Sequence, residues 1–250
     1  MNSTEINRYK NLIESSNVYE IAQITPITRA NQLSKVLKNE ILLKREDLQP
    51  IFSFKVRGAY NKLAKLKKKG QKGPVIAASA GNHAQGVAYG AKNLGIKAYI
   101  VMPITTPAIK VNSVKNYGGK VILQGDNFDE AFKFAKDLAK REGYTFIHPY
   151  DDKDVIVGQG TVGKELIEQI DNGIDAVFVP VGGGGLLAGL GTYIKAVSPK
   201  TKIIGVEPED AACLKLALEN NKRLSLSEVG LFSDGVAVKQ IGKRTYSLIK

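Results

Sequence analysis

Residues 75–103 read VIAASAGNHAQGVAYGAKNLGIKAYIVMP and contain one complete strand–helix–strand unit. The apolar run 75–79 predicts a short strand, and 81–94 predicts a helix that Gly95 closes. A second strand is predicted over 98–102, where the following proline stops it. Two strands joined in this way by a helix are the repeating unit of a parallel α/β sheet.

The same alternation extends along most of the chain. Further strands are predicted at 120–123, 144–147, 176–181 and 202–206, with helices at 106–117, 127–142, about 160–170, 185–197 and 209–220. Upstream lie a helix at 3–15, a strand at 41–44 and a helix at about 55–69. The parallel strands are nearly unbroken apolar runs, which is typical of strands covered on both faces. The chain is therefore assigned to the α/β class.

Composition excludes several other classes. The net charge of +12 comes from 36 basic residues spread along the whole chain. Their one run, 65–72, ends an amphipathic helix and has no interleaved aromatic residues, so it indicates a solvated face rather than a nucleic-acid site. No apolar stretch approaches the roughly 18 residues of a membrane span, and the polar, periodic residues 1–19 predict no signal peptide. Cys213 is the single cysteine, which rules out an intramolecular disulfide, and we expect a cytoplasmic protein.

The strongest local signal is VPVGGGGLLAG, residues 179–189, between a predicted strand and a predicted helix. Successive glycines let several backbone N–H groups face one point, and the following helix adds its positive end, so the loop predicts a phosphate site. A dinucleotide is one alternative, because Gly183, Gly185 and Ala188 match its fingerprint and Glu207 ends the next strand. A tight turn that binds nothing is the other.

A second motif is Ser53-Phe54-Lys55, followed by Val56-Arg57-Gly58-Ala59. Lys55 begins a predicted helix and follows an apolar segment, so its amine is expected to be partly desolvated. Desolvation and the helix N-terminus both lower the pKa of a lysine and keep its amine nucleophilic. Such a lysine suits imine formation with an aldehyde cofactor.

A third motif, SAGNHAQGVA at 79–88, lies at another strand-to-helix junction. Small residues there leave backbone N–H groups open to a substrate carboxylate, and the Asn82 amide can donate to a phenolate-like oxygen. For Ser79, capping of the helix is an equally good interpretation.

These three motifs, in this order, resemble the fold-type-II pyridoxal-phosphate (PLP) enzymes, whose architecture is that of the tryptophan synthase β subunit. Within that family the sequence resembles the threonine dehydratases, from about Ile24 to the last residue. The stretch 230–239, GLFSDGVAVK, resembles their biosynthetic form.

The resemblance implies roles for the matching residues. Lys55 would hold PLP as a Schiff base and transfer protons, and Phe54 would pack beside the cofactor. The amide of Asn82 would bond the ring oxygen of PLP. The phosphate would be held by Gly182, Gly183, Gly184, Gly185 and Leu186. The substrate carboxylate would be bound by Ser79, Ala80, Gly81, Asn82 and His83.

The implied reaction is dehydration and deamination of L-threonine, or of L-serine as an alternative, which for threonine gives 2-oxobutanoate and ammonia in isoleucine biosynthesis. Residues 75–148 would form a small mobile domain, while 1–74 and 149–250 would form the large PLP-binding domain. The full-length family member would be a homo-oligomer, a tetramer by resemblance.

Some departures from the family pattern qualify this interpretation. We expect the chain to be C-terminally truncated, because residues 244–250 read like the opening of a helix. The family's late glycine-rich stretch, with the group facing the pyridine nitrogen, and its C-terminal regulatory domain are both absent, so the large domain is expected to be incomplete. An inactive fragment is therefore a second interpretation, and an NAD-dependent oxidoreductase a remote third. No metal is predicted, because Cys213 replaces the aspartate that related serine racemases carry six residues after the position of Glu207.

Overall fold

The computed structural model describes residues 3–230 and 232–250, so one residue of the 230–239 stretch lies outside the described part. The α-helices are α1 (Ser3–Glu14), α2 (Asn31–Leu37), α3 (Lys55–Lys68), α4 (Asn82–Leu94), α5 (Ala108–Asn116), α6 (Phe128–Glu142), α7 (Lys153–Gln169), α8 (Gly185–Val197), α9 (Cys213–Glu219) and α10 (Lys243–Ile249). The strands are β1 (Ile27–Arg29), β2 (Leu42–Lys44), β3 (Val75–Ala78), β4 (Ala98–Met102), β5 (Lys120–Leu123), β6 (Thr145–Phe146), β7 (Ala176–Pro180) and β8 (Lys202–Val206). Short 3-10 helices are η1 (Val18–Glu20), η2 (Glu46–Leu48) and η3 (Glu209–Ala211).

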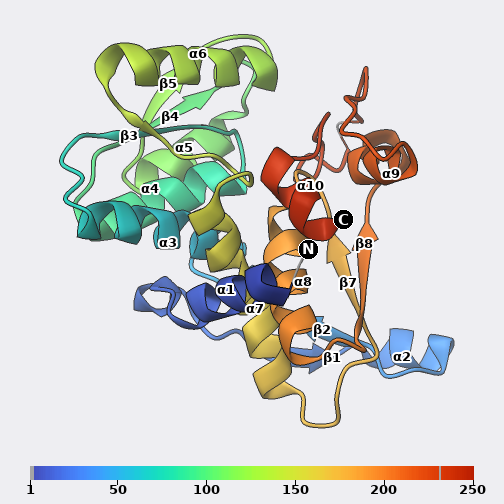
Figure 1. Ribbon diagram of the computed structural model, residues 1–250. Coiled ribbons are helices and arrows are strands. Elements are labelled where there is room, and N and C mark those ends of the chain that lie inside the picture. The colour runs from blue at the N-terminus through green and yellow to red at the C-terminus, as the bar shows by residue number, and fades with distance from the viewer. Residues whose placement is uncertain (1–2, 231) are drawn as a thin grey trace.

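A four-stranded parallel sheet with the order β5-β4-β3-β6 occupies one side of the molecule (Figure 1). Its central strand β3 is buried along its whole length. Helix α6 covers one face through Ala131 and Ala135, which pack against Ile76 and Val101. Helices α3, α4 and α5 cover the other face. The sheet is thus buried on both faces, as its apolar strands predict.

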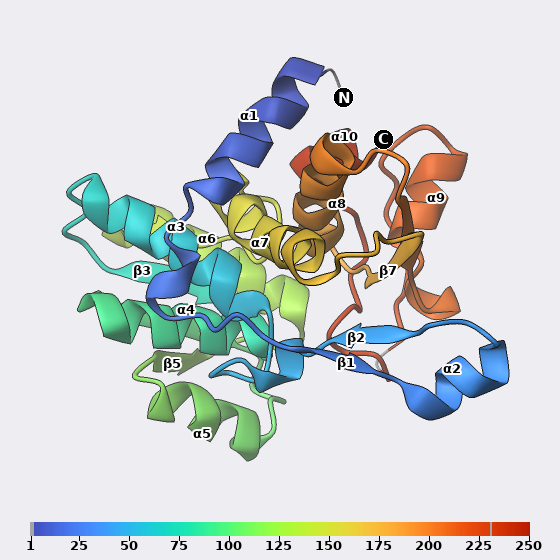
Figure 2. The ribbon, with the colours of Figure 1, turned by 90° about the horizontal axis from the view of Figure 1, so that it is seen from below.

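The remaining strands form two short pairs. Strands β7 and β8 are parallel, and β1 and β2 are antiparallel. Helices α7 and α8 pack against each other beside the β7–β8 pair, and α1 crosses both helices (Figure 2). A core of α7, α8, α9 and strand residues fills the space between them, including Val179, Leu187 and Ile194.

Helix α3 connects the two halves of the molecule. Its residues Ala59 and Leu63 belong to the core of the four-stranded sheet. On the α7 side, a Cβ added to Gly158 would lie 2.5 Å from the carbonyl oxygen of Arg57, so the two backbones are in direct contact. Helix α3 ends at Lys68, shortly before the predicted domain boundary at residue 74, and it packs both on the four-stranded sheet and on α7.

The predicted helix ends are confirmed where capping residues mark them. Asn127 caps α6 by accepting a hydrogen bond from the Glu130 N–H at 3.0 Å. Gly95 and Gly143 end their helices with φ angles of 67° and 69°, in the left-handed region that favours glycine.

The prediction for the helix at about 160–170 was wrong at its start, because α7 begins at Lys153. Asp152 caps it, with Oδ1 accepting from the N–H groups of Asp154 and Val155. The glycines at 158, 160 and 163 weaken the helical pattern in the sequence. In the structure they allow close contacts with α3, α1 and α8.

Other differences concern short elements. The single helix expected at 209–220 is a 3-10 turn followed by α9, and β1 and α2 were not predicted. Strands β7 and β8 are not covered on both faces: among their large apolar side chains, Phe178 is 68% exposed and Val206 is 48% exposed. No helix in the described part of the chain is long and apolar enough to cross a membrane.

Candidate active site

Lys55 occupies the first position of α3. The hydroxyl of Ser53 accepts a hydrogen bond from the Lys55 backbone N–H at 3.3 Å, which fixes the turn into the helix. The side chain is half-buried, and its Nζ donates to the carbonyl oxygen of Pro149 at 3.1 Å. Nζ also lies 5.4 Å from the centre of the Phe54 ring. The amine is therefore held where the chain passes from β6 to α7.

The surroundings of this amine favour its neutral form. Burial lowers the pKa of Lys55 to about 8, from an ordinary value of 10.5. At pH 7 about one amine in ten is thus unprotonated, far more than for an ordinary lysine, and the neutral amine is the form that attacks an aldehyde. This agrees with the desolvation that the apolar residues before Lys55 predicted.

The loop before α4 carries unused hydrogen-bond donors. Ser79 does not cap the helix: its hydroxyl accepts from the Gly81 N–H at 3.2 Å, within the loop. The N–H groups of Ala80, Asn82 and His83 donate to no described residue, and neither does the exposed Asn82 amide. Three backbone donors at the positive end of a helix form a suitable site for a carboxylate.

His83 provides a buried acceptor beside this loop. Its Nε2 lies 3.0 Å from the carbonyl oxygen of Ile147, and since a carbonyl only accepts, Nε2 carries the proton. Burial lowers the pKa of His83 to about 3, with the nearby Lys55 charge contributing, so the ring is neutral. Nδ1 then has a free lone pair, and it is buried without a partner in the described part of the chain. A bound ligand with a hydrogen-bond donor would satisfy it.

The glycine loop is closely packed against Tyr150 and Ile241. A Cβ added to Gly183 would lie 2.3 Å from ring atoms of Tyr150, and one added to Gly185 would lie 3.1 Å from the Tyr150 Cβ. Gly184 has a φ of +86°, and a Cβ there would lie 2.7 Å from Ile241. These positions therefore require glycine for packing and backbone conformation as well as for any ligand.

The N–H groups of this loop are nevertheless available. None of the backbone N–H groups of residues 182–187 donates to any residue that the structure describes. The carbonyl oxygens behave differently: that of Gly183 accepts from the Thr245 hydroxyl at 2.7 Å. Buried N–H groups normally have partners, so an unpaired series at a helix N-terminus indicates an anion site. The residues present thus fit a phosphate-bearing aldehyde cofactor.

The three motifs meet at residues 147–150, which the sequence analysis did not single out. The carbonyl of Ile147 bonds to His83, the carbonyl of Pro149 bonds to Lys55, and the Tyr150 ring packs on the glycine loop. Such a segment carries little signal in a single sequence, because two of its three contacts are made by backbone carbonyls and the third is packing of a ring. Each candidate motif therefore touches this segment.

Glu207 and Cys213 have structural roles. The Glu207 carboxylate accepts from the N–H groups of Leu214 and Lys215 at 2.8 and 2.9 Å, at the start of α9. The Cys213 side chain is fully buried in the core around α8, where it packs as a small apolar residue. Among the described residues, no cluster of three or more His, Cys, Asp or Glu side chains could hold a metal ion.

Comparison with known proteins identifies the class of this site. The family model of pyridoxal-phosphate dependent enzymes matches residues 19–250. The chain belongs to this family and has its fold-type-II architecture, so PLP is the cofactor for which the site is built. The dinucleotide interpretation of the glycine loop is therefore wrong.

Individual proteins of the family differ in how similar they are to this chain. The chain is 57% identical over 240 residues to a biosynthetic chloroplastic threonine dehydratase 1 of Solanum lycopersicum, covering 96% of this chain and 40% of that protein. Its fold matches the processed form of threonine deaminase isoform 2 from the same plant with a TM-score of 0.96, at 48% identity over 99% of this chain and 68% of that one. Maize serine racemase matches with a TM-score of 0.88, at 32% identity over 98% and 72% of the two chains. The chain spans between 40% and 48% of the length of eight similar curated proteins named as threonine dehydratases.

Proposed function

We propose that this chain contributes the PLP-binding site of an ammonia-lyase that converts L-threonine to 2-oxobutanoate and ammonia. The observation that carries the proposal is the desolvated Lys55 amine, held at the segment that also contacts the glycine loop and the loop at 79–83. The substrate is taken from similar proteins, since the tomato relative is a biosynthetic threonine dehydratase.

The chain's own residues have separable tasks in this proposal. PLP, when bound, withdraws electrons from the substrate Cα. Lys55 attaches the cofactor and later takes the Cα proton, which requires the neutral amine that burial favours. The free N–H groups of residues 182–187 hold the phosphate, with Phe54 and Asn82 beside the ring. The N–H groups at 79–83 orient the substrate carboxylate.

Further parts of the proposal concern the parent protein. Residues 75–148 form the small mobile domain, and residues 1–74 with 149–250 form the large domain. The intact enzyme is a homo-oligomer that acts in isoleucine biosynthesis, and we place it in the cytoplasm. The separate four-stranded sheet supports the small domain at 75–148. The word "biosynthetic" in the names of similar proteins supports the isoleucine pathway.

Threonine turnover tests the proposed reaction. The purified chain is incubated with PLP and L-threonine, and 2-oxobutanoate is measured by its NADH-dependent reduction with an added dehydrogenase. We expect PLP-dependent release of the oxo acid, and L-serine in a parallel sample compares the two hydroxy-amino acids. A chain that binds PLP covalently but releases no oxo acid from either amino acid would contradict the proposed reaction for this polypeptide.

We also expect elimination without racemisation. The resemblance to serine racemases implies a serine immediately before Gly-Asn-His as the proton donor on the opposite face of Cα, and this chain has Ala80 there. A methyl group cannot transfer a proton, so only the Lys55 face is served. Chiral chromatography of an L-serine reaction should show no D-serine, whereas an Ala80→Ser variant should form some. D-serine from the unaltered enzyme would refute this assignment.

A further inference from the structure

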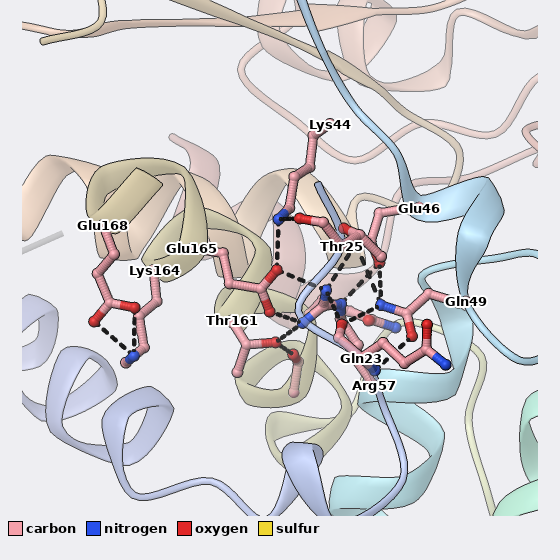
Figure 3. Close-up of polar contacts among 12 residues, drawn as sticks. Gln23, Thr25, Lys44, Glu46, Gln49, Arg57, Thr161, Lys164, Glu165 and Glu168 are labelled. Carbon is pink, nitrogen blue, oxygen red and sulfur yellow. Dashed lines mark hydrogen bonds and ion pairs between the residues drawn. The ribbon is translucent and has the colours of Figure 1, made fainter. Parts of the chain in front are cut away.

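Four charged side chains form a buried ion cluster where α3 and α7 meet: Lys44, Glu46, Arg57 and Glu165 (Figure 3). Arg57 is completely buried, Glu165 is 1% exposed and Lys44 is 8% exposed, each by side chain. Two cations face two carboxylates, so the cluster is electrically balanced. None of these four residues is among those assigned to bind the cofactor or the substrate.

The guanidinium of Arg57 is held from several directions. Nε and Nη2 each donate to one oxygen of the Glu46 carboxylate, both at 2.7 Å. Nη1 and Nη2 donate to the two oxygens of Glu165 at 2.5 and 3.0 Å. Nη1 also donates to the Thr161 hydroxyl at 3.1 Å, and Nη2 to the Gln23 carbonyl at 3.2 Å. Two bidentate pairs fix the guanidinium plane in a way that a single ion pair does not.

The other ions complete the cluster without leaving an unpaired charge. Lys44 Nζ lies 2.6 Å from Glu165 and donates to the Thr25 carbonyl at 2.6 Å. Burial alone would raise the pKa of the Glu165 carboxyl, but the hydrogen bond and charge of Arg57, with those of Lys44, hold it below its usual value. The carboxylate is therefore ionised, and the cluster is a set of charges rather than of neutral hydrogen-bonding groups.

The cluster lies directly behind the candidate active site. Arg57 is two residues from Lys55, in the first turn of α3, and Glu165 is on α7. The same turn is attached to α7 once more, where the Gly58 N–H donates to Gln159 at 3.2 Å. The cluster thus joins the Lys55 turn to α7. Helix α7 begins shortly after Pro149, whose carbonyl accepts a hydrogen bond from Lys55.

We propose that Arg57 is a positioning residue, which acts through the buried ion cluster to hold the first turn of α3 and with it the Lys55 amine. The proposal rests on the proposed function in that Lys55 is the cofactor lysine. Replacing a buried ion pair with well-packed apolar residues is often neutral or favourable for stability, so stability alone gives no reason for four buried ions. Directional bonds that fix one orientation of the helix give such a reason.

Three variants separate positioning from stability. Arg57→Met leaves two carboxylates with one cation and should destabilise the fold. The double variant Arg57→Met with Glu165→Met removes one cation and one carboxylate, keeps the charges of Lys44 and Glu46 balanced, and should recover much of the thermal stability. Lys164→Met is the matched control, because it breaks the partly exposed pair with Glu168, 2.6 Å apart, on the same helix (Figure 3).

The readout is the reactivity of Lys55 itself. Competitive acetylation with acetic anhydride across a pH series, followed by mass spectrometry, gives a titration midpoint for each lysine without PLP. In the unaltered chain the Lys55 midpoint is expected near 8. In the double variant the loosened turn admits water to the amine, and we expect the midpoint to rise by about 1 pH unit, which lowers the reactivity at pH 8 about fivefold. The Lys164→Met chain should match the unaltered one.

The double variant decides the matter. Recovered thermal stability together with a raised Lys55 midpoint supports the positioning role. Recovered stability with an unchanged Lys55 midpoint overturns it, since the cluster would then serve the fold alone. Absorbance of the PLP imine, measured on the same samples, reports separately on the proposed function, because the acetylation result does not depend on PLP.

Discussion

Replacing Lys55 with alanine is expected to abolish covalent attachment of PLP and to lower the rate of threonine elimination by at least about 10³-fold. The physical reason is that this side chain supplies both the attacking amine and the base for the Cα proton. Attachment is measured by the absorbance of the PLP imine, and elimination by 2-oxobutanoate release.

Lys65→Ala is the matched control for that experiment. Lys65 lies on the same helix, ten residues after Lys55, and its amine is paired with Asp154 at 3.1 Å. A partly exposed pair of this kind contributes at most about 1 kcal/mol, so imine absorbance and activity should remain near those of the unaltered chain. Retention of the imine in the Lys55→Ala chain would show that another lysine holds the cofactor.

The glycine loop provides the second large effect. In Gly183→Val, the new Cβ would lie 2.3 Å from the Tyr150 ring, so the loop or the ring must move. Each hydrogen bond to a charged phosphate contributes about 1.5–3 kcal/mol, and displacement of two should weaken PLP binding by about 100-fold or more. An absorbance titration gives the Kd, and far-UV circular dichroism verifies that the variant is folded.

Gly191→Ala is the corresponding control. Gly191 lies on α8, the helix that follows the loop, and a Cβ there would meet only Ile203, at an ordinary 3.6 Å. Alanine is also the better helix former, so stability should be kept or raised and PLP affinity unchanged. A folded Gly183→Val chain with unaltered PLP affinity would contradict the assignment of this loop to the phosphate.

The motifs that carry the chemistry could be found in the sequence because they are local. Asn82 and the glycines at 182–185 stand at strand-to-helix junctions where small residues gather, and Lys55 begins a helix after an apolar segment. The strands before Asn82 and before the glycines belong to different sheets, so the proximity of the motifs depends on how the two halves of the molecule pack. The structure places these junctions around residues 147–150.

The features that could not be predicted depend on distant partners. Tyr150 is significant because its ring meets Gly183, and no local pattern links the two. Arg57 was read only as part of the Lys55 motif, since its partners Glu46 and Glu165 lie 11 and 108 residues away. The glycines of α7 are another example. They weaken the helical pattern in the sequence, and their purpose is visible only in the close contacts that they allow with other helices.

Chemical trapping of the cofactor tests the central claim most directly. The chain is mixed with PLP, the imine is reduced with borohydride, and the pyridoxyl group is located by peptide mapping. The account predicts one dominant label, on Lys55, whose pKa burial lowers to about 8, and little on the other lysines. A stoichiometric label on any other lysine, with Lys55 unmodified, would contradict the assignment of the active site.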